Sequence, residues 1–277
     1  MAEIKASDVA KLRQMTGAGM MDCKHALTET NGDFDQAIDI LRKKGQKVAN
    51  KRADREAAEG AAIAKANSDH TFGVVLVLNC ETDFVALNAD FVKKAHLFAD
   101  AALAAKVTTL EALKELTVDG HTIGSELMNM TGIIGEKVDI SFFKTLESPF
   151  VMPYIHPGNR LATLVSMTKK IADEQPAKDV AMQVAAMAPV AVNKDRIPQA
   201  IIDKELEIGR AIAIEEGKPA SIVDKIAEGK LGKFFKENTL ISQDFIKDHK
   251  ISVGDYLTHI DKDLTVVDFI RFTLNES

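Results

Sequence analysis

Tryptophan is absent from this chain of 277 residues, and tyrosine and cysteine occur only twice each. So few aromatic side chains leave little surface on which bases could stack, and a formal charge of −6 at pH 7 disfavours a general polyanion-binding protein. Cys23 and Cys80 are too few for a disulfide framework and lack the spacing partners of a zinc site. We therefore expect two reduced thiols, no metal site and a main partner other than nucleic acid.

Long hydrophobic runs are missing as well. The longest apolar runs, such as residues 74–78, are far shorter than the ~18 residues that a membrane-spanning segment needs. The first residues also lack the apolar stretch of a signal peptide. These absences predict a cytoplasmic protein without a membrane partner.

The short motifs of common nucleotide-binding and catalytic sites do not occur. The chain has no phosphate-binding Gly-x-x-x-x-Gly-Lys-Ser/Thr loop, no Gly-x-Gly-x-x-Gly, no His-Glu-x-x-His and no Gly-x-Ser-x-Gly. The sequence therefore predicts no nucleotide pocket of its own and no cofactor. An enzyme with a dispersed site would leave no motif, so that class stays open but unsupported.

The first 45 residues predict a three-helix module. Ser7 can cap the first helix, and a second helix runs from about Met20 to Thr30. Asp33 and Gln36 form a capping box for a third helix, which Gly45 ends. The chain is long enough for two or three compact units, and this module is the first.

A basic and then alanine-rich stretch follows the module. Seven of the fourteen residues from Arg42 to Arg55 are Lys or Arg, and alanines continue to Ala64. We interpret residues 46–62 as a linker. A basic run of this kind is usually a solvated face, and contact with RNA or an acidic protein is the alternative.

Beyond the linker, the spacing of the apolar residues changes from a helical to a strand-like pattern. Residues 72–80 are apolar except for Asn79 and rich in β-branched side chains, which predicts a strand buried on both faces. A helix from about Ala89 carries Phe91, Ala95, Phe98 and Ala102 on one face. A weak echo about 88 residues later, at Leu164 and Val165, suggests a second, similar α+β half.

Further strands and a helical insertion complete the predicted α+β fold. Residues 150–155 and 161–167 predict a β-hairpin, and residues 265–274 predict a strand that returns to the second sheet. Helical periodicity returns after Pro189, with Gly217-Lys218-Pro219 as the turn of a protruding αα-hairpin. The expected core therefore has antiparallel sheets and two parts, listed by residue range: an N-subdomain over 63–146, a C-subdomain over 147–188 and 236–277, and a helical-hairpin insertion over 189–235.

Two apolar features stand outside this core. Phe84 follows the buried strand in a short loop, where an aromatic either folds back into the core or projects as an exposed wedge. Met20 and Met21 open a helix, and because adjacent helical residues point about 100° apart, both can hardly be core. The residues alone leave both alternatives open.

Two long motifs resemble a known family. Leu12-Arg13-x-x-Thr16-Gly17-Ala18-Gly19-Met20-Met21-Asp22-Cys23-Lys24-His25-Ala26-Leu27 and Leu78-Asn79-Cys80-Glu81-Thr82-Asp83-Phe84-Val85-Ala86 closely resemble the two signatures of bacterial translation elongation factor Ts. Looser likeness over residues 134–136, 156–160 and 216–219 extends it to essentially the whole chain. His25, Leu87 and Val77 depart from the residues that are common in that family.

The resemblance implies a guanine-nucleotide exchange factor for elongation factor Tu, with a UBA-like N-terminal module and a coiled-coil hairpin. It also implies that no covalent chemistry takes place. Its implied contact residues fall into two groups: Thr82, Asp83, Phe84 and Val85, which would disturb the partner's Mg²⁺ and nucleotide site, and Arg13, Met20, Met21, Ile134, Gly135, Glu136 and His156, which would add partner contacts. The competing class is a cytosolic RNA-binding or scaffolding protein, and an enzyme using Asp83 is a third.

Overall fold

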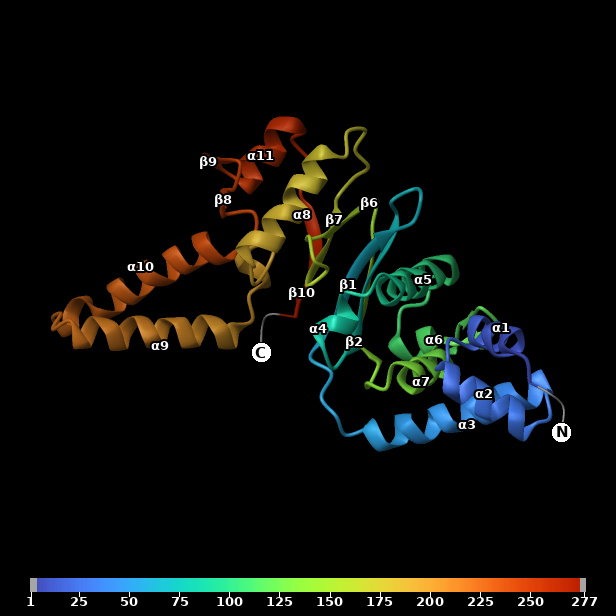
Figure 1. Cartoon of the computed structure of the whole chain (residues 1–277). Coiled ribbons are helices and arrows are strands. Elements are labelled where there is room, and N and C mark those ends of the chain that lie inside the picture. The colour runs from blue at the N-terminus through green and yellow to red at the C-terminus, as the bar shows by residue number, and fades with distance from the viewer. Residues whose placement is uncertain (1–3, 275–277) are drawn as a thin grey trace.

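The computed structural model describes residues 4–274. Its centre is a pair of three-stranded antiparallel sheets (Figure 1). The first sheet has the strand order β1-β2-β5, formed by Glu59–Ala66, Phe72–Cys80 and Asp139–Glu147. The second has the order β10-β7-β6, formed by Val266–Thr273, Leu161–Met167 and Phe150–Ile155. The predicted α+β class with antiparallel sheets is confirmed.

Strand β2 is buried on both faces because it lies in the middle of the first sheet and faces different layers on its two sides. Val74, Leu76 and Leu78 pack into a core with helices α5 (Ala89–Ala105) and α7 (Ile123–Ile134). Val75 and Val77 point the other way, into a core between the two sheets. All nine residues of β2 are buried, which confirms the prediction.

The second half repeats this arrangement. Strand β7 is the central strand of its sheet, and helix α8 (Gln175–Met187) follows it as α5 follows β2. Val165 and Val180 share a core with α11 (Val253–Ile260) on the outer face of this sheet. The strand-helix unit is therefore repeated, with the sheets stacked face to face and helices outside, but not in the register of the sequence echo, since Leu76 and Leu164 face different cores.

A helical hairpin projects from the second half, as predicted (Figure 1). Helix α9 (Gln199–Glu215) packs closely on α10 (Ala220–Asn238), since a Cβ added at Gly209 would lie 3.0 Å from the Cα of Ala227. Gly217 adopts φ of +71° in the turn, a conformation that suits glycine. The remaining short elements are α6 (Leu110–Glu115), β3 (Thr117–Val118), β4 (His121–Thr122), a 3₁₀ turn (Lys194–Arg196), β8 (Asp244–Phe245) and β9 (Asp248–Ser252).

The N-terminal module consists of α1 (Ala6–Thr16), α2 (Met20–Glu29) and α3 (Phe34–Arg52). Lys5, not Ser7, occupies the N-cap position of α1. Asp33 caps α3 by accepting a hydrogen bond from the Gln36 amide at 3.0 Å, but the predicted capping box is incomplete, because the Gln36 side chain donates to the Asp33 carboxylate and not to its backbone.

The predicted helix stop at Gly45 is wrong. Helix α3 runs through this glycine to Arg52, because Gly45 meets Gly132 of α7 where the two helices cross. The predicted linker over 46–62 is thus helical at its start, and β1 begins at Glu59. The division into domains stays a prediction, and its outermost residues, 1–3 and 275–277, lie outside the described part.

Across residues 4–274, no helix is both long enough and apolar enough to cross a membrane.

Candidate functional site

Phe84 lies on a one-turn helix, α4 (Asp83–Ala86), directly after β2. Its side chain is 83% exposed, whereas Val85 packs partly and Ala86 fully against the core of the first half. The core interpretation of Phe84 is therefore wrong, and the exposed position that a wedge requires is present. Leu87, 70% exposed, follows on the same turn.

The turn is fixed at both ends. At its start, Glu136 accepts hydrogen bonds from the backbone amides of Glu81 and Thr82 at 3.1 and 3.0 Å, and from the Thr82 hydroxyl at 2.7 Å. At its end, the Asn88 side chain caps α5 by accepting a hydrogen bond from the Asp90 amide at 2.9 Å. An exposed aromatic on such a turn is held at a defined place.

Glu136 can contact Thr82 because helix α7 ends at Ile134, two residues before Glu136. Gly135 follows α7 with φ of +79°, a left-handed conformation that turns the chain, and Ile134 before it packs partly into the core. The backbone role of Gly135 is thus that of a helix-ending turn. The proposed partner contacts of Ile134, Gly135 and Glu136 stay predictions, but the carboxylate of Glu136 is occupied within the chain.

Cys80, the last residue of β2, lies beneath this turn. Burial, and next to it the charges of Glu136 and Glu59, raise the pKa of its thiol to about 12. The thiol therefore stays protonated at neutral pH, and it is a packing group rather than a nucleophile.

His156 is exposed at the start of the turn between β6 and β7, and its Nδ1 lies 3.0 Å from the Tyr154 hydroxyl. The same turn touches β1, since Arg160 pairs with Glu59 and the Ala62 amide donates to the carbonyl of Asn159 at 2.7 Å.

Strand pairing then relates this turn to Phe84. Glu59 is the register partner of Cys80 on β2, and Thr82 comes two residues later. His156 and Phe84 therefore lie at the same end of the paired sheets. The partner contact of His156 stays a prediction.

Arg13, Met20 and Met21 are all exposed on the three-helix module, the two methionines by 47% and 61%. They lie on α1 and α2, near the N-terminal end of the long helix α3, whereas α4 lies toward its C-terminal end (Figure 1). The structure therefore does not bring the three side chains together with Phe84. Any partner that touches both groups has to span the length of α3.

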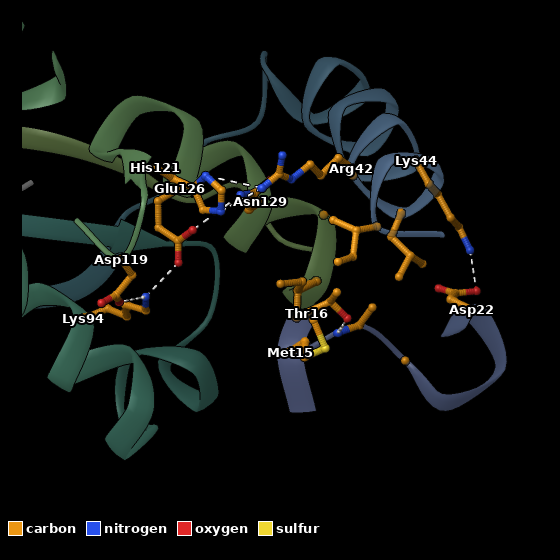
Figure 2. A pocket seen from close by; sticks show the side chains of 17 residues that line it. Met15, Thr16, Asp22, Arg42, Lys44, Lys94, Asp119, His121, Glu126 and Asn129 are labelled. Carbon is orange, nitrogen blue, oxygen red and sulfur yellow. Dashed lines mark hydrogen bonds and ion pairs between the residues drawn. The ribbon is translucent and has the colours of Figure 1, made fainter. Parts of the chain in front are cut away.

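A cavity of about 360 Å³ lies between this module and the core (Figure 2). Its charged side chains pair with one another: Lys94 with Glu126 at 2.8 Å and Asp119 at 3.2 Å, and Arg42 with His121 at 2.8 Å. Burial opposes the charge of Lys94, but its two carboxylate partners raise the pKa overall. The three cationic and three carboxylate side chains of the lining balance in number, so the cavity is a polar gap between two packed units rather than a prepared anion site.

The sequence interpretation missed residues that support the candidate site. Glu81 and Arg52 make close contacts behind the Phe84 turn, although the sequence places Arg52 in a basic run typical of a solvated face. A tally of charges cannot separate one paired arginine from its exposed neighbours. Among residues 4–274, no group of three or more His, Cys, Asp or Glu side chains is arranged to hold a metal ion.

Comparisons with known proteins address the resemblance directly. The family model described as "Elongation factor TS" matches residues 81–276. The Elongation factor Ts of Christiangramia forsetii is 54% identical over 275 residues, covering 99% of this chain and all of that protein. Those of Flavobacterium psychrophilum and Amoebophilus asiaticus are 52% and 48% identical, covering 99% and 97% of this chain and 100% and 98% of the respective relatives. With relatives this similar over nearly its full length, the chain belongs to the elongation factor Ts family.

Proposed function

We propose that this protein is a guanine-nucleotide exchange factor for elongation factor Tu. It binds the GDP-bound form, promotes the release of GDP and Mg²⁺, and remains bound until GTP enters. It acts in the cytoplasm without a cofactor. Family membership supports the general role, and the observation that carries the detailed one is the exposed Phe84 on a turn fixed at both ends.

Exchange of this kind needs no covalent step. A protein that binds the nucleotide-free partner more tightly than the GDP-bound partner lowers GDP affinity by the same ratio, because the two equilibria are linked. Exchange therefore depends on the contacts that the protein makes with each state of its partner. Phe84 is the apolar wedge that enters between partner elements, and Thr82 and Val85 hold it in place.

Asp83 gives the wedge its polar side. Its side chain is exposed next to Phe84 at the start of α4. In the proposed complex it acts as a hydrogen-bond acceptor or competing charge near the disturbed Mg²⁺ site. It need not bind the metal.

The test measures GDP release. Elongation factor Tu carrying fluorescent GDP is mixed with this protein and excess unlabelled nucleotide in a stopped-flow instrument. We expect release to accelerate with protein concentration and to saturate. A rate independent of the added protein would overturn the proposal.

Salt dependence distinguishes an exchange factor from the alternative, an RNA-binding or scaffolding protein. Phosphate binding weakens steeply with salt, because bound counterions are released, whereas an apolar wedge is much less sensitive. We expect binding to elongation factor Tu to persist at salt concentrations that remove RNA. Tight, salt-sensitive RNA binding without an effect on GDP release would favour the alternative.

A further inference from the structure

Three segments far apart in the sequence are tied together directly behind the Phe84 turn. The first is the C-terminal end of α3, the second is the start of the turn at Glu81 and Thr82, and the third is the segment that follows α7 at Glu136. Arg52, the last residue of α3, donates to both carboxylate oxygens of Glu81 at 2.7 and 2.9 Å.

The contacts between the second and third segments are reciprocal. Glu136 accepts from the amides of Glu81 and Thr82, while Glu81 accepts from the amide of Lys137 at 2.6 Å. The Lys137 ammonium closes the ring by donating to the carbonyls of Ala53 and Arg55 at 2.8 and 2.9 Å. Each carboxylate thus fixes backbone of the other segment, and charge-assisted hydrogen bonds of this kind are about twice as strong as neutral ones.

These contacts are partly shielded from water. The side chains of Glu81 and Arg52 are 18% and 34% exposed. The Lys137 amide, and after it Arg52, lower the pKa of the Glu81 carboxyl against the opposing effect of burial. Glu81 is therefore charged at neutral pH, which keeps the ring of contacts closed.

Helix α3 is a continuous rod from the three-helix module to this ring. It reaches from Phe34 to Arg52 without a break and crosses α7 at Gly45 and Gly132. Since α7 itself ends next to Glu136, both helices lead from the crossing to the Phe84 turn. A shift of the module is therefore transmitted to the turn rather than absorbed by a flexible linker.

We propose that Arg52, Glu81 and Glu136 form a clamp, through which α3 positions the Phe84 turn for nucleotide release. This inference rests on the proposed function, because it assigns the three residues to the same exchange step. They are positioning residues: they act through Phe84 and do not touch the partner's nucleotide. The N-terminal module then contributes to the release step as well as to affinity.

The first measurement is amide hydrogen exchange in the free full-length protein. Arg52→Ala keeps the Glu81 carboxylate, which accepts a hydrogen bond from the Lys137 amide. It removes only the guanidinium that donates to this carboxylate. We expect exchange of the Glu81, Thr82 and Lys137 amides to accelerate at least about tenfold, because the variant loses both charge-assisted hydrogen bonds from Arg52 to Glu81. Lys51→Ala, exposed on the same helix, should leave these amides unchanged.

The second measurement is the GDP release rate from elongation factor Tu at saturating concentrations of the variant. Arg52→Ala and Glu136→Gln should each lower the maximal rate about tenfold, while Arg52→Lys restores part of it and Lys51→Ala keeps the normal rate. Because the clamp acts through Phe84, adding Arg52→Ala to Phe84→Ala should cause less than a twofold further loss. Melting temperatures confirm that each variant is folded.

The outcomes separate the two proposals. A normal rate for Phe84→Ala would overturn the wedge, and with it the clamp's part in release. A slow Phe84→Ala beside normal release and normal amide exchange in Arg52→Ala would overturn the clamp alone. Fully multiplied losses in the double variant would also overturn it, because they would place Arg52 and Phe84 in independent steps.

Discussion

Gly45 of α3 and Gly132 of α7 cross with their backbones in contact. A Cβ added at Gly132 would clash with the Cα of Gly45, and one added at Gly45 would lie 3.4 Å from the Cα of Gly132. Only a residue without a side chain fits at position 132. The crossing therefore sets how closely the three-helix module docks on the core.

The first prediction follows from this crossing. Gly132→Ala should destabilise the protein by about 1–3 kcal/mol, as forced overpacking usually does, and should lower its melting temperature. The control is Gly229→Ala in α10, where an added Cβ meets nothing within 4 Å. Alanine there should be neutral or stabilising by about 0.5–1 kcal/mol, because glycine is a poor helix former. Equal melting temperatures for the two variants would contradict the tight crossing.

Gly45 also shows where local sequence stops being informative. A glycine after an apolar helical face fits a helix end, but it equally fits a close helix crossing, and only the contact with Gly132 decides between them. Strand β1 was missed for a related reason. Its alanines carry no strand preference, and they are buried because β2 lies beside them, the second sheet covers Ala62 and Ala64, and the helix-covered core takes Ala61.

The candidate site was predictable only in part. From residue pattern alone Phe84 could be core or wedge, and the motif resemblance implies the wedge. Glu136 was assigned to partner binding, yet its carboxylate holds the amide of Thr82. Contacts of this kind join residues more than fifty positions apart, so no spacing in the sequence signals them.

The second prediction concerns pH. The pKa of Glu81 is lowered in the folded protein, so its charged form stabilises the fold above the ordinary pKa near 4.5, and that contribution is lost as the pH falls through the folded value. Glu81→Gln should therefore be less stable than the natural protein at pH 7, and the gap should shrink toward pH 3. Urea unfolding at both pH values measures it. Glu228→Gln, exposed on α10, is the control for a surface Glu→Gln substitution.

The third prediction concerns His156. Its side chain is exposed and its hydrogen bond reaches only the nearby Tyr154 hydroxyl, so His156→Ala should leave the melting temperature unchanged. As a partner contact it should raise the dissociation constant of the complex with elongation factor Tu severalfold. His249→Ala, exposed on β9, is the matched control and should bind normally. A lower melting temperature with normal binding would show that His156 stabilises the turn and does not contact the partner.

The fourth prediction concerns the module's exposed side chains. Met20→Ala, Met21→Ala and Arg13→Ala should weaken complex formation, because these side chains offer contact area on α1 and α2. At saturating concentration the GDP release rate should stay normal, since none of them touches the clamp. Lys24→Ala on α2 is the control for surface substitution. Unchanged affinity in all three variants would show that these side chains do not contact elongation factor Tu.

The last prediction tests the wedge itself. Loss of a buried aromatic anchor at an interface costs ~2–4 kcal/mol, and a tenfold change corresponds to about 1.4 kcal/mol. Phe84→Ala should therefore slow stimulated GDP release tenfold to several-hundredfold. Because Phe84 is 83% exposed in the free protein, circular dichroism and the melting temperature should stay near normal.

Two control variants are compared with Phe84→Ala. Phe98→Ala removes a fully buried aromatic from α5 and should destabilise the protein by about 3–5 kcal/mol, which shows that the melt detects a lost core phenylalanine. Leu87→Ala removes the exposed neighbour of Phe84 and separates a specific wedge from a general loss of apolar surface. A wedge at Phe84 predicts a much smaller effect for Leu87→Ala. Equal slowing in both variants would assign release to the whole apolar face of the turn instead, because no single side chain would then account for the loss.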